Sequence, residues 1–348
     1  MALCVFFILA LMQGKGIAEN TDTSDTVTLI LGGDVMLSNW VMEHLDKDGL
    51  EYPFLGIQDI LQRGDIRFCN LEAPIGTYAD TLKSEKKYTF ALPPRYRHAI
   101  KYGDFDIVSL ANNHILDYSS HLADSTVHYL DELGIKQVGY GHNSYEAPGP
   151  VILERKGLRI GFLAYSMTFP REFWASPSRP GTAYPDAVNF GDMVQNLEDD
   201  VDFTVVSFHW GAENSDSTKQ YQQDFARKAV DMGADLIVGH HPHIWQGLED
   251  YKDRLIAYSV GNLCFGSFSP TALQSGLLEV EIGPDTIHVA KIHPLDVNNV
   301  RVRFQPRKLD EPGTVKFFND LRYFSSRFDS SSTTVIEDDG TVRWGVRD

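Results

Sequence analysis

The sequence predicts an α/β fold in which a largely buried sheet is covered by helices. Short runs rich in β-branched residues recur along the chain and are apolar on both faces, which is typical of central strands in a covered sheet. Segments with helix-like spacing separate many of these runs, and this alternation favours α/β architecture. The chain has 348 residues, 43% of them hydrophobic, and is long enough for one large domain or two ordinary ones.

The expected elements follow one another from residue 27 to about residue 282. Apolar β-branched runs predict strands over residues 27–31, 66–69, 107–110, 159–164, 203–208, 236–238, 255–258 and 277–282. Apolar residues at helical spacing predict helices over residues 38–45, 56–62, 125–133, 192–197 and 221–232. Fewer helices separate the late strands, which suggests a partly antiparallel second half and a second sheet packed on the first.

Both ends of the chain differ from this central region. Residues 2–12 are apolar, too few to span a bilayer, so residues 1–18 are expected to be a signal peptide and the protein extracytoplasmic. No basic residue precedes the run, which leaves a cytoplasmic protein as the alternative. Residues 27–295 are expected to form the main domain. Residues 296–348 mix charges with a serine-rich run, and we expect a peripheral extension that wraps the domain or serves as an interaction arm.

Charge and cysteine content exclude some classes of protein. The chain has 48 acidic and 31 basic residues and a formal charge of −17, which opposes a sequence-independent grip on nucleic acid. The same charge repels a polyanionic substrate unless bound cations or a local basic patch reverse the field. Three cysteines, one of them in the expected leader, imply no disulfide framework.

Polar side chains that can bind a metal ion follow five of the expected strands. Five of the twelve histidines lie in three of these positions, and acidic and amide residues lie in the others. Because the carboxyl ends of strands in an open α/β sheet face the ligand crevice, segments far apart in sequence can converge there. We therefore predict one metal or catalytic site. Its expected ligands are Asp34, Glu72, Asn113, His114, His209, His241 and His243.

Local spacing refines this prediction around the last histidines. His241 precedes a proline and is biased to an extended backbone, in which residues two apart project to the same side. His241 and His243 should therefore point together into the site. His240 should point away and serve a structural role, unless the chain turns at this point.

Two acidic residues lie at suggestive spacing from the ligands. Asp117 follows His114 by three residues and would meet it on one face of a helix, as a carboxylate that fixes the histidine tautomer. Glu213 follows His209 by four residues and is a second supporting carboxylate or an acid. A solvated or helix-capping role is the alternative for both. The candidate catalytic residues are thus Asn113, His114, Asp117 and Glu213.

The expected ligand set combines hard oxygens and imidazoles and contains no thiolate. This chemistry favours Mn, Fe, Zn or Mg over copper or an iron–sulfur cluster. The groups suffice for two ions roughly 3.5 to 4 Å apart, which would activate a water and neutralise the leaving oxygen. A pair of ions needs a bridging carboxylate, and Asp34 or Glu72 can supply it.

Six segments in series carry a family resemblance. They are GDVM at residues 33–36, NLEAP at 70–74, ANNHILDY at 111–118, HWGAE at 209–213, GHHPH at 239–243 and YSVGNLCF at 258–265. In this order they resemble the CapA family of poly-γ-glutamate capsule biosynthesis proteins over about residues 27–295. That family is similar to the calcineurin-like metallophosphoesterases. The resemblance implies a four-layer sandwich of two mixed β-sheets flanked by helices, with a site for one or two metal ions.

The resemblance also implies roles for individual residues. Asp34 matches the aspartate of the first phosphoesterase motif, Glu72 stands near the bridging acid, and the Asn-His pair, the lone histidine and the closing pair follow in order. Two departures stand out. Met36 occupies the place of a phosphoesterase histidine, which puts occupancy of one metal position in doubt, and Glu72 replaces an aspartate. The matching positions are Asn113, His114, His209, His241 and His243.

Three functional interpretations remain open from the sequence. The first is a metal-dependent hydrolase acting on a small phosphoester or on a bond in an envelope polymer, in association with capsule-synthesis membrane proteins. The second is a non-catalytic surface protein that holds a cation and binds or helps export polyglutamate. The third is a structural protein with a vestigial cluster. A basic lip for polyglutamate would come from residues that more often form a solvated face: Lys83, Lys86, Lys87, Arg95 and Arg97.

Overall fold

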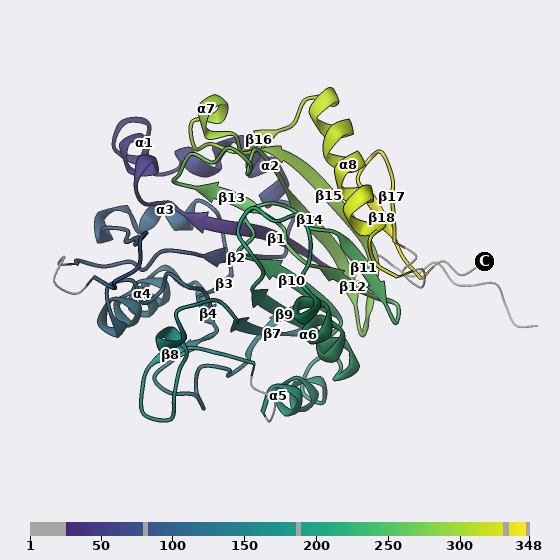
Figure 1. Cartoon of the computed structure of the whole chain (residues 1–348), viewed down its shortest axis with the longest axis horizontal. Helices are drawn as coiled ribbons and strands as arrows, with labels where there is room; N and C mark the ends of the chain where they lie inside the picture. Colours follow the sequence, from purple (N-terminus) through teal and green to yellow (C-terminus); the bar gives the residue numbers. More distant parts are fainter. Residues whose placement is uncertain (1–25, 79–82, 186–188, 330–333, 346–348) are drawn as a thin grey trace, which may run out of the picture.

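The protein folds into two β-sheets packed face to face, with helices on the outer face of each (Figure 1). The computed structural model describes residues 26–78, 83–185, 189–329 and 334–345. The predicted signal peptide, residues 1–18, lies outside the described residues. The α/β class and the four-layer arrangement predicted from the sequence are confirmed. Among the described helices, none is long and apolar enough to cross a membrane.

The larger sheet is mixed and is built around β1 (Val27–Met36). β1 pairs in parallel with β2 (Ile66–Leu71) and β13 (Asn262–Phe265), and antiparallel with β14 (Gln274–Gly283). The strand order is β17-β18-β15-β14-β1-β2-β3-β4, and β16 pairs with β15. The remaining strands of this sheet are β3 (Ile107–Ser109), β4 (Lys136–Val138), β15 (Thr286–Asp296), β16 (Arg307–Lys308), β17 (Val335–Ile336) and β18 (Thr341–Arg343).

The smaller sheet has a parallel centre and antiparallel edges. Its order is β11-β12-β10-β9-β7-β6, in which β12, β10, β9 and β7 run parallel. The late strands are antiparallel as predicted, but β14 and β15 join the first sheet, because β14 pairs with β1. The strands are β6 (Val151–Arg155), β7 (Leu158–Ser166), β9 (Phe203–His209), β10 (Leu236–His240), β11 (Leu248–Tyr251) and β12 (Arg254–Ala257), and β5 (Tyr140–Gly141) pairs separately with β8 (Gly181–Thr182).

Alternation along β1 explains why its sequence is apolar on both faces. Leu29 and Leu31 pack into the core between the two sheets, whereas Ile30 packs into the core between the first sheet and its helices. Successive strand residues point to opposite faces, so a covered sheet needs apolar residues at every position. The helices over this sheet are α1 (Trp40–Asp48), α2 (Gln58–Leu61), α3 (His98–Lys101) and α4 (Ser120–Leu133); short 3₁₀ turns are Tyr52–Ile57, Pro94–Tyr96 and Arg171–Phe173.

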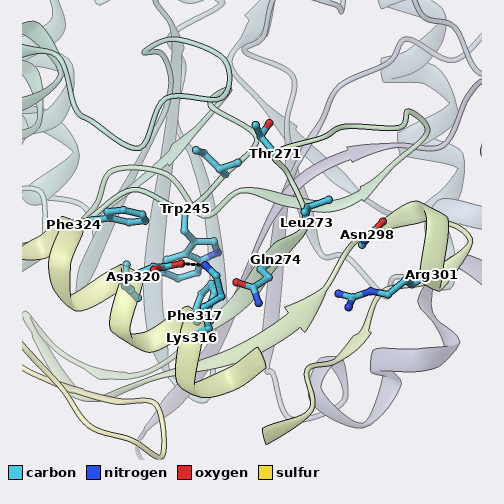
Figure 2. Close-up of a pocket in the computed structure, with 12 residues that line it drawn as sticks. Trp245, Thr271, Leu273, Gln274, Asn298, Arg301, Lys316, Phe317, Asp320 and Phe324 are labelled. Atoms are coloured by element: carbon cyan, nitrogen blue, oxygen red, sulfur yellow. Dashed lines mark hydrogen bonds and ion pairs between the residues drawn. The ribbon is translucent and has the colours of Figure 1, made fainter. Parts of the chain in front are cut away.

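Two amphipathic helices cover the second sheet, and a third closes one end of the sandwich. α5 (Asn189–Glu198) and α6 (Gln220–Asp231) contribute apolar residues to the outer core of that sheet. α8 (Glu311–Ser325) follows α7 (Asn299–Val302), and its Phe317, Phe318 and Leu321 join the core between the sheets. Beside α8 lies a cavity of about 350 Å³, which Trp245 and Phe317 line and where Lys316 pairs with Asp320 (Figure 2).

A crossing segment, residues 258–261, leads from the end of β12 in one sheet to β13 in the other. It passes very close to two glycines. A Cβ on Gly33 would lie 1.9 Å from the carbonyl oxygen of Gly261, and one on Gly239 would lie 1.9 Å from that of Tyr258. The Asp34 amide donates to the Gly261 oxygen (2.9 Å), and the Val260 amide donates to Gly239 (3.1 Å). The segment therefore joins the carboxyl ends of β1 and β10.

Glu279 on β14 makes the larger sheet sensitive to acid. It accepts hydrogen bonds from Arg63 (2.7 Å) and His293 (2.6 Å). Burial alone would raise the pKa of Glu279, but these partners lower it to about 2. Because the folded pKa lies below the ordinary glutamate pKa of 4.5, the stability from this carboxylate is fully present above that value and is lost as pH falls toward 2.

We therefore expect the free energy of unfolding to fall as the pH is lowered from about 5 to about 3, and to fall by about 1–2 kcal/mol more in the wild type than in Glu279→Gln. This range allows for solvent screening at Arg63, which is half-exposed. Urea denaturation at several pH values measures this difference. Glu154→Gln on edge strand β6, whose carboxylate is exposed, is the control and should follow the wild type. Parallel pH profiles for wild type and Glu279→Gln would contradict the assignment.

Candidate metal centre

The predicted ligands converge at the carboxyl ends of strands from both sheets. Asp34, Glu72 and His209 each offer a ligand atom, and these atoms all lie within 4.8 Å of one another. Glu72, His241 and His243 form a second such group. Glu72 belongs to both groups and therefore lies where a bridging carboxylate of a two-ion site would lie. Asp34, its alternative in that role, belongs to the first group only.

Unpartnered polar atoms indicate that this cluster fits a cation. Glu72 is completely buried, and its Oε1 has no hydrogen-bond partner. The Nδ1 of buried His241 also has none. A buried carboxylate oxygen without a partner is costly in a protein interior, whereas a divalent ion would satisfy it. The donor set of carboxylates and imidazoles suits Mn, Fe, Zn or Mg, as predicted.

Burial keeps two of the histidines in the form that binds metal. It lowers the pKa of His241 to about 3, helped by His243, and lowers the pKa of His209 well below its usual range. Both rings are therefore neutral at ordinary pH, as metal ligation requires. Glu72 and Asp34 outweigh burial at His243 and raise its pKa to about 9. Burial and the nearby Asp34 carboxylate raise the pKa of Glu72 well above its usual value.

His209 and His114 lie on the side of the cluster toward β3. The Nε2 of His209 lies 2.8 Å from the Oδ1 of Asn113 and 3.7 Å from Glu72 Oε1. His114 Nε2 lies 3.9 Å from the same Glu72 oxygen. Asn113 and His114 belong to the turn after β3, so all seven predicted ligands are close to the centre, although neither of these two belongs to the two tightest groups.

Asp117 contacts His114 as predicted, with 2.6 Å between Asp117 Oδ2 and His114 Nδ1. The condition that a helix starts near His114 is not met, because α4 begins at Ser120, and a tight turn brings the pair together instead. Lys86 donates to Asp117 Oδ1 (2.8 Å) and to the Asn113 carbonyl oxygen, so its ammonium is directed inward. A solvated face is therefore the wrong interpretation for Lys86. Arg97 instead lies 3.5 Å from Glu132 on α4.

The backbone prediction around the last histidines is wrong. His241 and His243 have φ angles of 94° and 62°, so the chain turns here despite the following proline. Their rings still face the centre, with centroids 6.0 Å apart. His240 does not point away, because its Nδ1 lies 3.6 Å from Asp34 Oδ1. It ends β10 in register with His209 of β9.

Two buried asparagines support the carboxylates, a role that was not predicted from the sequence. Asn70 donates from Nδ2 to Asp34 Oδ1 (2.8 Å), and the same nitrogen lies 3.4 Å from Glu72 Oε2. Asn112 donates to Asn70 Oδ1 (3.0 Å) and accepts from the His114 amide (3.0 Å). The available signal was position, since Asn70 directly follows one expected strand and Asn112 comes two residues after another, both within the quoted motifs.

The remaining candidates lie at the edge of the centre. Met36 is buried against Ala73, Phe265 and Phe90, and its sulfur accepts a hydrogen bond from Ser38 Oγ (2.8 Å). Glu213 is exposed and borders a cavity that also reaches His114 and His243. Asn262 Oδ1 lies 2.9 Å from His243 Nδ1, and His243 Nδ1 lies 3.1 Å from Asp34 Oδ2.

Comparison with known proteins places this arrangement in a family. The chain is 27% identical over 280 residues to capsule biosynthesis protein CapA of Bacillus anthracis, in an alignment that covers 79% of this chain and 68% of the relative. It is 25% identical over 299 residues to PGA biosynthesis protein CapA of Bacillus subtilis (strain 168), covering 84% and 79%.

A solved structure, a putative 5'-nucleotidase from Staphylococcus aureus in complex with alpha-ketoglutarate, is 12% identical with a TM-score of 0.51. The alignment covers 86% of this chain and 58% of that one, and the likeness is one of fold. Residues 28–267 match the sequence profile described as "Bacterial capsule synthesis protein PGA_cap". With the predicted motifs all inside that range, the chain belongs to this capsule synthesis protein family.

Proposed function

We propose that the protein is a metal-dependent hydrolase of the phosphoesterase type that acts on an envelope polymer or on a small phosphoester. The observation that carries the proposal is Glu72, a buried residue with one unpartnered oxygen that belongs to both groups of candidate ligands. Relatives named for capsule and PGA biosynthesis support an envelope setting. We further propose an extracytoplasmic location, a main domain over residues 27–295 with an extension over 296–348, and association with capsule-synthesis membrane proteins.

One or two divalent ions would be held by Asp34, Glu72, His209, His241 and His243, with Asn113 beside His209. Bound there, such ions supply Lewis acidity and neutralise charge on a leaving oxygen. Asn70 orients the Asp34 carboxylate through its hydrogen bond of 2.8 Å. The shell of buried amides and neutral imidazoles excludes water and fixes the ligands, which favours a preorganised site.

His114 is the proposed proton carrier of the reaction. Its Nδ1 donates to Asp117, which fixes the tautomer and leaves Nε2 directed toward Glu72 and the cavity. Lys86 donates to the other oxygen of Asp117 and so holds the carboxylate in place. Protonated at Nε2, His114 would deliver a proton to a leaving oxygen, and Glu213 at the rim would orient the substrate.

A non-catalytic protein that binds or helps export polyglutamate is the second candidate. Met36 favours it, because a thioether packed against Phe265 and Phe90 replaces an imidazole ligand and reduces the centre toward one ion. A single ion would still hold a carboxylate-rich polymer, while the chemistry that needs a pair of ions would be lost.

Metal counting and turnover test the first candidate together. We expect the purified protein to retain about one or two equivalents of a divalent ion and to hydrolyse a generic phosphoester such as p-nitrophenyl phosphate. His241→Ala should lower both, with turnover reduced by roughly 100-fold or more. The control is His128→Ala, which removes a histidine whose side chain is 69% exposed on α4.

The outcomes separate the alternatives. Less than one equivalent of any ion, with folding unaffected by chelation, would rule out a metal role. An ion that is bound and lost in His241→Ala, together with no turnover of any phosphoester, would favour the binding protein instead. Elemental analysis of the same preparations used for the kinetics measures both quantities.

A further inference from the structure

A cavity of about 410 Å³ opens directly beside the candidate metal centre. His114, His243 and Asn262 border its inner end, and Trp40, Tyr88 and Phe268 border its outer part. The volume is within the range of roughly 300–1,000 Å³ that is usual for small-molecule sites. A ligand that fills it therefore contacts the centre at one end and the outer rings at the other.

Three large rings around this cavity are exposed. Trp40, Tyr88 and Phe268 are 56%, 58% and 53% exposed, and the centroids of Trp40 and Phe268 are 5.8 Å apart. Leaving so much apolar surface in contact with water is unfavourable, and rings gathered at a polar cavity mark a binding surface. We call Trp40 and Phe268, with Tyr88, the aromatic platform.

The backbone holds two of these rings in place. Trp40 begins α1, after the loop that follows β1, and Phe268 lies in the loop that follows β13, which runs parallel to β1. Gly266 keeps the loops in contact, since a Cβ there would lie 2.1 Å from the Ser38 carbonyl oxygen. Asn39 has φ 57° and ψ −123°, a conformation that side-chain-bearing residues rarely adopt and that clusters at functional sites. The platform is therefore preorganised.

Most polar side chains around the platform carry no charge. Asn39, Asn214 and Ser267 offer amide and hydroxyl groups to the cavity. Among the described residues that border it, none is lysine or arginine, and Glu213 is the one carboxylate. Basic groups nearby are His243 at the inner end and Lys87, whose ammonium lies 4.8 Å from the centroid of the Tyr88 ring. In the outer part, one ammonium and one carboxylate balance each other, so charge does not select a polyanion over a neutral ligand there.

We propose that the aromatic platform binds a neutral saccharide, so that the substrate is a glycan whose phosphoester reaches the metal centre. The C–H face of a sugar ring packs on an aromatic ring, and its hydroxyls pair with amide and hydroxyl side chains. A nucleobase needs a flat slot, whereas the planes of Trp40 and Phe268 are inclined by 57°. The phosphoester part of this inference rests on the proposed function, whereas binding of the saccharide is independent of it.

Calorimetric titration of the full chain tests the saccharide site without requiring turnover. The probes are cellotetraose, maltotetraose and the tetramer of N-acetylglucosamine, compared with a γ-linked glutamate tetramer and AMP. We expect at least one saccharide to bind, with much of the affinity coming from the rings of the aromatic platform. Trp40→Ala and Phe268→Ala should each weaken this binding by about tenfold. Tyr145→Ala, which removes a ring that is 75% exposed outside the cavity, should leave it unchanged.

Three results would overturn the proposal: no saturable heat from any saccharide up to about 10 mM, equal binding in both variants and wild type, or tighter binding of the glutamate tetramer or AMP. Circular dichroism confirms that the variants fold. Turnover of p-nitrophenyl phosphate by the wild type is measured in parallel. Saccharide binding without any turnover would keep this inference and reject the hydrolase, and the reverse result would do the opposite.

Discussion

Turnover of a phosphoester should fall at least about 10³-fold when Asp34 is replaced with asparagine, a loss of about 4 kcal/mol of transition-state stabilisation. Asp34 is completely buried and offers one oxygen to the group that contains Glu72 and His209. Asparagine keeps the shape of the side chain but removes the negative charge that a divalent ion requires. The bound ion should therefore be lost together with turnover.

The fold should survive this substitution. Asn70 can still donate to an amide oxygen in place of Asp34 Oδ1, so the hydrogen bond of 2.8 Å is retained. Steady-state kinetics, elemental analysis and a thermal melt in the presence of a chelator measure the three quantities. Asp59→Asn, at an exposed aspartate of α2 that pairs with Lys308 of β16, is the matched control. Unchanged metal content in Asp34→Asn would remove Asp34 from the ligand set.

Replacing Gly239 with alanine should lower the free energy of unfolding by about 3–5 kcal/mol. The added Cβ would lie 1.9 Å from the Tyr258 carbonyl oxygen and 2.7 Å from Trp210 Nε1. Neither the backbone of the crossing segment nor the buried indole can move freely. The hydrogen bonds from Val260 to Gly239 (3.1 Å) and from Trp210 to Tyr258 (2.8 Å) would be stretched together.

Urea denaturation measures this effect against a glycine of the opposite kind. Gly191 lies in α5, and its nearest neighbours are atoms of the Met232 side chain at 3.5 Å or more. Gly191→Ala should therefore be neutral or stabilise the protein by up to about 1 kcal/mol, because alanine is the better helix former. A similar small effect in Gly239→Ala would mean that the crossing segment can withdraw without cost.

The sequence predicted the convergence of ligands and eight strands, because both depend on local pattern, whereas strands such as β13 and β15 were not predicted. The eight are β1, β2, β3, β7, β9, β10, β12 and β14. Apolar runs such as 203–208 mark buried strands, and polar residues directly after them must lie at one edge of the sheet. Asp34, Glu72 and His209 were found by this rule alone. The second sheet was only partly foreseen, because the pairing of β14 with β1 joins segments more than 200 residues apart and leaves no local trace.

What the sequence could not predict depends on tertiary contacts. The proline after His241 favours an extended backbone, yet the Asp34 carboxylate accepts from the His241 amide (3.3 Å) while the chain turns. Lys86 lies in a charged stretch that reads as solvated, and only the fold brings Asp117 to its ammonium. The supporting role of Asn70 likewise requires knowledge of what lies beside β1.

The position of the candidate centre at the junction of the two sheets has a mechanical consequence. Asp34 lies in β1 and Glu72 directly follows β2, and both strands belong to the larger sheet. His209 ends β9 and His241 directly follows β10, and these strands belong to the smaller sheet. An ion bound by all four residues would link the two sheets. It would stabilise the folded protein by about 2.7 kcal/mol when the free ion concentration is about a hundred times its dissociation constant. The rigidity of the sandwich would then follow the supply of divalent ions around the protein, looser where ions are scarce and tighter where they are plentiful.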